Sequence, residues 1–208
     1  PIKSKRVQVS KLKFSKQELD VLQDSNFFLV KHQATLGIQN LLGELCQSLE
    51  TVEKNEATPV SGLNEKSGKI FRGENYRLLP YVVLDYPRYF SKDSIFAFRS
   101  MFWWGNGFSF TLHLQGKAFH ELCSTIEHNL KLLVNLGVFV CVNKDSPWEY
   151  HYAEENYQPL EEWLKKNESV NLKQKEFVKF SRRLDLENYS QVTEFGTETW
   201  LLFKKLCS

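Results

Sequence analysis

The residues best suited to binding chemistry lie on one face of a predicted β-hairpin, over about residues 94–115. The register argued below places Arg99 opposite His113, with Thr111 and Trp103 on the same face. A guanidinium, an imidazole, a hydroxyl and an indole together suit a small anionic or planar ligand. The alternative interpretation is that this face is simply the polar, water-facing side of an antiparallel sheet.

The segment Asp85-Tyr86-Pro87-Arg88 adds a carboxylate and another arginine. If the sheet brings Asp85 near His113, the two could act as acid and base, with Arg99 anchoring an anionic substrate. A carboxylate at a strand end is equally able to form a local turn with its own backbone. The candidate catalytic residues are therefore His113 and Asp85, and the candidate ligand-binding residues are Arg99, His113, Thr111, Trp103 and Arg88.

Metal and nucleotide chemistry find little support in the sequence. His120, Cys123 and Glu127 share one predicted helix, but Cys123 belongs to its apolar stripe and the other two flank it, as at the border of an ordinary amphipathic helix. The four cysteines are widely spread with no C-x-x-C pair, and we interpret them as reduced thiols. The sequence has no glycine-rich phosphate loop, no H-E-x-x-H and no G-x-S-x-G. We predict no metal and no cofactor.

The composition is that of an ordinary globular protein, with 42% hydrophobic, 25% charged and 14% aromatic residues. No apolar run reaches the roughly 20 residues of a membrane span, and no signal peptide follows the basic start, so we expect a cytoplasmic protein without membrane contact. The net charge of +2 predicts no strong attraction to nucleic acid. Basic clusters near both ends of the chain leave nucleic-acid binding as an alternative. One is the basic start, and the other consists of Lys173, Lys175, Lys179, Arg182 and Arg183. Exposed aromatic side chains would also suit a homodimer interface.

The register of the hairpin follows from its hydrophobic pattern. A three-residue turn pairs Trp104 with Phe108 and places the apolar residues of both segments on one face. A two-residue turn shifts the pairing by one and sets polar residues opposite them, so burial selects the longer turn. Gly107 then supplies the left-handed conformation that such turns use. The predicted apolar face consists of Phe96, Phe98, Phe102, Trp104, Phe108, Phe110, Leu112 and Leu114.

Helices are predicted before and after the hairpin. Ser15 and Glu18 have the spacing of a capping box at the start of a first helix. Apolar stripes at helical spacing, or favourable end residues, predict further helices over 27–52, 117–135 and from Pro159. The segment 197–206 is expected to be a helix or a strand, and we favour the helix. Strands are predicted at 81–85, 138–142, 148–152 and 177–184. We expect a surface loop at 53–69 and a flexible basic segment at 1–13.

Hairpin strands with segregated helices indicate an α+β fold, in which amphipathic N-terminal and middle helices pack on an antiparallel sheet. We expect a single domain over residues 1–208. The functional prediction is a ligand-binding or scaffold domain whose polar hairpin face meets a small anionic ligand or a protein partner. Two alternatives remain open: an enzyme with His/Asp acid–base chemistry, and a nucleic-acid-binding protein with basic termini.

Overall fold

The structure is a computed structural model that describes residues 11–55, 68–167 and 171–208. Two compact units divide the chain, Pro1–Gly37 and Ile38–Ser208. In the first unit, α1 (Lys16–Gln23) begins with the predicted capping box. The Ser15 hydroxyl accepts a hydrogen bond from the Glu18 amide at 3.2 Å, and the Glu18 carboxylate accepts one from the Ser15 amide at 2.6 Å.

Helix α2 (Ser25–Asn55) begins in the first unit and ends in the second. The predicted apolar stripe is buried in its later part, where Leu45 and Leu49 are fully covered. The earlier part was also predicted as core, which is wrong, because Phe27 and Val30 are 48% and 55% exposed. The described residues of the first unit contain no strand, so they offer this part of the stripe no sheet to pack on.

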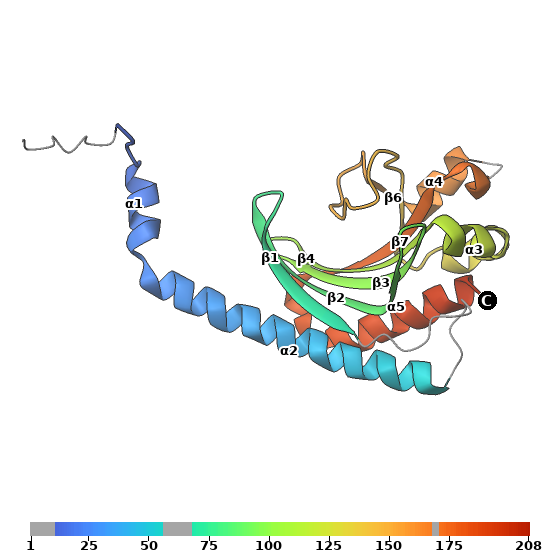
Figure 1. The fold of residues 1–208 in the computed structure, drawn as a ribbon, viewed down its shortest axis with the longest axis horizontal. Coiled ribbons are helices and arrows are strands. Elements are labelled where there is room, and N and C mark those ends of the chain that lie inside the picture. Colours follow the sequence, from blue (N-terminus) through green and yellow to red (C-terminus); the bar gives the residue numbers. More distant parts are fainter. Residues whose placement is uncertain (1–10, 56–67, 168–170) are drawn as a thin grey trace, which may run out of the picture. The chain divides into compact units, whose positions relative to one another are not determined.

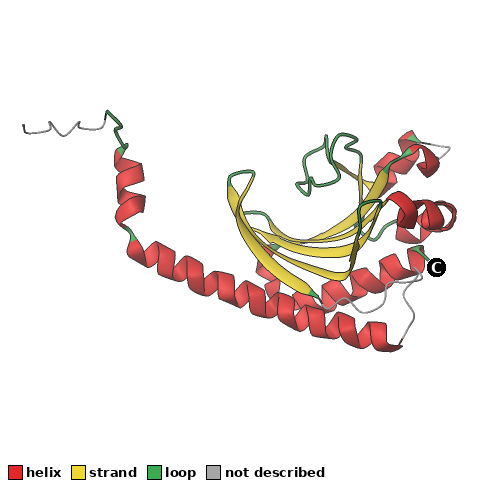
Figure 2. Cartoon of the chain, in the orientation of Figure 1, coloured by secondary structure: helices red, strands yellow, loops and turns green. Residues whose placement is uncertain are grey.

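Seven strands of the second unit form one antiparallel sheet in the order β1-β2-β3-β4-β7-β5-β6, which confirms the α+β class (Figures 1 and 2). The strands are β1 (Lys69–Tyr76), β2 (Leu79–Phe90), β3 (Ser94–Trp103), β4 (Gly107–Gln115), β5 (Phe139–Cys141), β6 (Tyr157–Pro159) and β7 (Phe177–Leu184). The further helices are α3 (Gly116–Asn129), α4 (Leu160–Lys166) and α5 (Val192–Leu206), with short 3-10 turns at Leu130–Leu133, Leu172–Gln174 and Leu186–Gln191. The helices predicted at 117–135, from Pro159 and at 197–206 are therefore confirmed.

The β3–β4 hairpin has a three-residue loop, as predicted, but the loop consists of residues 104–106. Phe102 pairs with Phe108, whereas the predicted register paired it with Phe110. This shift of two positions leaves every side chain on its predicted face, because side chains alternate with a period of two. The apolar face is buried against α2, α3 and α5, and Trp104 lies half-buried beside it. We call it the helix face.

The opposite, polar face of the sheet lies under residues 142–156, which we call the covering segment (Figure 1). This segment contains no strand, so the strand predicted at 148–152 is wrong. The alternating aromatic residues pack onto the sheet from above instead of pairing beside it. Tyr150, for example, forms a small apolar cluster with Val83 and Met101. We call this side of the sheet the covered face.

The β1–β2 hairpin was not predicted. It turns at Arg77 and Leu78, whose φ angles are 49° and 68°. Turns of this kind usually carry Asn or Gly, so the sequence gives no turn signal here. Strand β2 also continues through Pro87, where we predicted its end. The pairing of β2 with β3 is irregular between Asp85 and Arg88. Proline has no N–H to donate, but in this irregular stretch no regular inter-strand hydrogen bond is lost.

The predicted surface loop at 53–69 is for the most part outside the described residues. Residues 53–55 belong to α2 and Lys69 begins β1, while 56–67 are not described. Of the predicted flexible segment 1–13, residues 1–10 are likewise not described. Within the described parts of the chain, no helix is both long and apolar enough to cross a bilayer.

Candidate functional site

Three rows of side chains run across neighbouring strands on the covered face. They are Val83, Met101, Ser109 and Arg183; Asp85, Arg99, Thr111 and Ser181; and Arg88, Ala97, His113 and Lys179. Arg99 and His113 therefore lie in successive rows, and the predicted pairing of one directly opposite the other is wrong. The predicted ligand-binding residues do share one face, but most of that face is closed off from solvent.

Arg99 is held by the carboxylate of Asp85 on the neighbouring strand. Arg99 Nε lies 2.7 Å from Asp85 Oδ1, and Nη2 lies 2.8 Å from Oδ2, which is a bidentate pair. The two side chains are only 13% and 5% exposed. The rings of Phe71 and Tyr150 lie 5.8 Å and 4.9 Å from the guanidinium carbon. Arg99 is thus a buried, paired cation and not an open anchor for a ligand.

His113 is 1% exposed, and its Nδ1 lies 3.1 Å from the hydroxyl of Tyr150. Burial, together with the positive charges of Lys179 and Arg99, lowers the pKa of His113 to about 3. The imidazole is therefore neutral near pH 7. The predicted acid–base pair with Asp85 is not formed, because Asp85 is engaged by Arg99 and His113 by Tyr150.

The other predicted ligand-binding residues differ in burial, since Thr111 is buried whereas Arg88 and Trp103 are half-buried. Thr111 Oγ1 lies 2.7 Å from Ser181 Oγ, which also contacts the hydroxyl of Tyr152 on the covering segment. That hydroxyl network is internal. Arg88 is half-buried on β2. Trp103 is half-buried near the hairpin loop, and it alone of the five lines an open cavity.

Lys179 is the most unusual charged residue of the covered face, since its exposed fraction is 0%. Its Nζ donates a hydrogen bond to the main-chain carbonyl of Glu149 and lies 4.6 Å, 5.3 Å and 5.8 Å from the ring centres of Tyr150, Tyr157 and Phe177. Burial lowers the pKa of Lys179 to about 8. The ammonium form therefore predominates at pH 7 inside a cage of aromatic rings.

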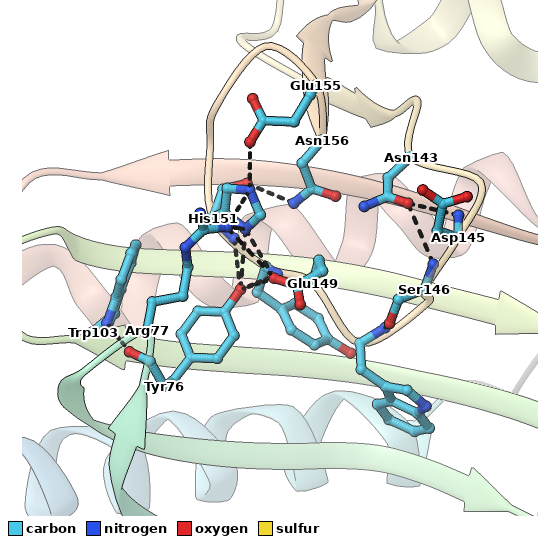
Figure 3. A network of polar contacts seen from close by, with 12 residues as sticks. Tyr76, Arg77, Trp103, Asn143, Asp145, Ser146, Glu149, His151, Glu155 and Asn156 are labelled. Atoms are coloured by element: carbon cyan, nitrogen blue, oxygen red, sulfur yellow. Dashed lines mark hydrogen bonds and ion pairs between the residues drawn. The ribbon is translucent and has the colours of Figure 1, made fainter.

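A polar network ties the covering segment to the β1–β2 hairpin (Figure 3). The Tyr76 hydroxyl donates to Glu149 Oε2 at 3.0 Å and accepts from the main-chain amide of Tyr150 at 2.7 Å. His151 Nδ1 lies 3.0 Å from the same Glu149 oxygen, and Arg77 Nη1 lies 2.8 Å from that nitrogen. The β1–β2 turn at Arg77 and Leu78 thus points the Arg77 side chain towards the covering segment.

An open cavity of about 390 Å³ lies at the end of the covered face near the hairpin loops. Arg77 reaches it from the β1–β2 turn and Arg183 from β7, and both are exposed. Trp103 and Tyr152 contribute aromatic walls, and Ser109 contributes a hydroxyl. Arg183 lies over the ring of Tyr152, with 4.9 Å between guanidinium carbon and ring centre. Among the described residues, no carboxylate pairs with Arg183.

A second cavity, of about 670 Å³, lies between β5, α4 and the start of β7. The side chains of its asparagines make hydrogen bonds with neighbouring residues of their own segments. Asn143 Oδ1 accepts from the Asp145 amide at 2.7 Å, Asn167 Nδ2 donates to the Trp163 carbonyl at 2.7 Å, and Asn171 caps the 3-10 turn at Leu172–Gln174. The cavity therefore has fewer polar groups available to a ligand than its lining indicates.

The basic cluster that motivated the nucleic-acid alternative does not form one surface. Lys179 is buried on the covered face, whereas Arg182, on the other face of β7, donates to Thr199 Oγ1 at 3.0 Å. Arg183 points back to the covered face. In the parts of the chain that the structure describes, no group of three or more His, Cys, Asp or Glu residues is placed to hold a metal ion.

Comparison of the chain with protein-family models, with curated proteins and with solved structures gives no match. The chemistry of the site therefore has to be argued from its own residues. The sequence did not predict Arg77 as a residue of the site, and it indicated Lys179 and Arg183 only as members of a basic cluster. The one available signal was the alternation of β7, which puts residues 179, 181 and 183 on a single face.

Proposed function

We propose that this protein binds a small anionic ligand with a planar, apolar part in the open cavity at the end of the covered face. The observation that carries the proposal is the convergence of two exposed arginines, Arg77 and Arg183, on a cavity with aromatic walls. The volume of about 390 Å³ lies within the range of small-molecule sites. A guanidinium binds carboxylate or phosphate by paired hydrogen bonds, and Trp103 and Tyr152 suit a flat ring.

The charges around the cavity favour an anion over a neutral ligand. Arg77 lies 3.8 Å from the carboxylate of Glu149, which also contacts Tyr76 and His151, and the carboxylate of Glu155 is near enough to interact with it as well. The guanidinium of Arg183 lies over the Tyr152 ring and has no carboxylate partner among the described residues. An incoming carboxylate or phosphate would therefore meet at least one charged donor that is free to pair with it.

Binding of phenyl phosphate tests this proposal, with inorganic phosphate and benzyl alcohol as probes of the charge and the ring alone. We expect phenyl phosphate to bind most tightly in isothermal titration calorimetry. Arg183→Gln should weaken it by about tenfold to a hundredfold, the effect of losing a charge-assisted hydrogen bond. The fold should be unaffected within roughly 0.5 kcal/mol, since Arg183 is exposed.

Arg72→Gln is the matched control, because Arg72 is an exposed arginine on β1 that does not line the cavity. It should leave phenyl phosphate binding unchanged, and Arg77→Gln should weaken it as Arg183→Gln does. Equal affinity for benzyl alcohol, or an equal loss in Arg72→Gln, would contradict the proposed anion site.

A further inference from the structure

More positive than negative charge is buried beneath the covering segment. Arg99 and Lys179 both lie there, and Asp85 is paired with Arg99. Among the described residues, Lys179 has no carboxylate within ion-pair distance; its ammonium donates to the main-chain carbonyl of Glu149, and the neutral Cys141 thiol lies beside it. An ammonium held away from water without a counter-ion is costly, so an anion at this position would be strongly favoured.

Two further polar atoms at the same place lack a partner. The Nε2 of His113 and the hydroxyl of Tyr157 are buried without a well-formed hydrogen bond to a described residue, although the side chains of Gln115 and Thr111 lie close to them. His113 pairs with Lys179 across β4 and β7, and the Tyr157 ring belongs to the cage around the ammonium. Buried polar atoms without a well-formed hydrogen bond are uncommon in native structures, and an oxygen of a ligand would give them a partner.

The covering segment closes this cluster mainly with aromatic side chains. Trp148 packs edge-on against His113 at 5.4 Å between ring centres and lies 5.7 Å from the guanidinium carbon of Arg99. Tyr150 lies over both Arg99 and Lys179. The ends of the segment meet, since the Val142 amide donates to the Asn156 carbonyl at 2.9 Å. A long irregular segment with joined ends and few ladder hydrogen bonds has the form of an active-site or binding-site lid.

Tyr150 separates the buried charge from the open cavity. Tyr150 lines the open cavity, and its ring and hydroxyl contact Arg99, His113 and Lys179. Displacing this one residue would join the cavity to the cationic cluster. The aromatic ring over two cations occupies the position where an anionic group would sit.

We propose that the covering segment is a lid that opens locally, and that the anionic group of the ligand then binds Lys179 and Arg99 in place of the Tyr150 ring. The inference rests on the proposed function and deepens it, because it gives the ligand's anionic group further partners in the interior. The two arginines of the cavity bind the same anionic group from its open side. His113 Nε2 and the Tyr157 hydroxyl become its further hydrogen-bond partners.

Acetylation of lysines by acetic anhydride, followed by peptide mass spectrometry, tests the opening of the lid. Lys204 is the matched internal control, since it is 6% exposed but lies on the helix face, where it pairs with Glu53 at 2.9 Å. Trp148→Ala removes lid contacts and should speed acetylation of Lys179 by roughly three- to tenfold. Acetylation of Lys204 should not change. An unchanged Lys179 rate, or equal acceleration at both lysines, would overturn the lid.

Saturating phenyl phosphate tests where the anion binds. In the wild-type protein it should slow acetylation of Lys179 by about tenfold at ten times the dissociation constant, and should leave Lys204 unaffected. If phenyl phosphate binds in calorimetry but Lys179 is not protected, the ligand uses the open cavity alone and the interior assignment is wrong. If it does not bind at all, the proposed function fails as well, and only the Trp148→Ala result then bears on the lid.

Discussion

Replacing Arg99 by alanine is expected to lower the free energy of unfolding by about 3–5 kcal/mol, because it leaves the carboxylate of Asp85 buried without its partner. The pair is bidentate, and the Asp85 side chain is only 5% exposed. Asp85→Asn should have a loss of similar size for the opposite reason, since the guanidinium then stays buried and unpaired. Urea unfolding at pH 7 measures both changes.

The double variant Asp85→Leu/Arg99→Met is the control for this expectation. It removes both charges at once, so it should be more stable than either single variant. If Arg99→Ala instead costs less than about 1 kcal/mol, the interpretation of the pair as a buried structural ion pair is wrong.

Acid is expected to destabilise the fold through His113. Its pKa is lowered to about 3 in the folded protein, against an ordinary value of 6.5. Between these two values the unfolded chain binds a proton that the folded chain does not, so stability falls as the pH falls from 6.5 towards 3. The loss is roughly 1.4 kcal/mol for each pH unit in that interval. Urea unfolding between pH 7 and 4.5 gives the slope.

His113→Asn separates this contribution from that of the carboxylates. Asparagine cannot take up the proton, but its amide can still meet the Tyr150 hydroxyl. The variant should be less stable than the wild type at pH 7 and should lose less stability towards pH 4.5. Parallel pH profiles for the two proteins would contradict the assignment to His113.

The parts of the fold that depend on local pattern were predictable. The capping box at Ser15, the helix face of the hairpin and helix α3 follow from residue spacing, and helix α4 follows from the residues at its ends. The partner of each hairpin residue was not predictable, because a shift of two positions preserves every face and so leaves the hydrophobic pattern unchanged. The turn at Arg77-Leu78 was missed because neither residue type favours its positive φ angles.

The candidate site was only partly predictable for a different reason. Polar alternation correctly placed Arg99, Thr111 and His113 on one face. It could not show that Tyr150 and its neighbours cover that face, since the contact joins segments far apart in the chain. Aromatic residues at every second position indicate a strand, but the same spacing also lets an irregular segment direct its rings towards a sheet.

The uncompensated ammonium of Lys179 has a consequence for protein engineering. A sequence selected only for thermostability would carry methionine or leucine at this position, because an apolar side chain of similar length fills the same space without desolvating a charge. A buried lysine here therefore costs stability, as groups with a functional role often do. Stabilising redesign of this protein should therefore leave residue 179 untouched until its role is measured.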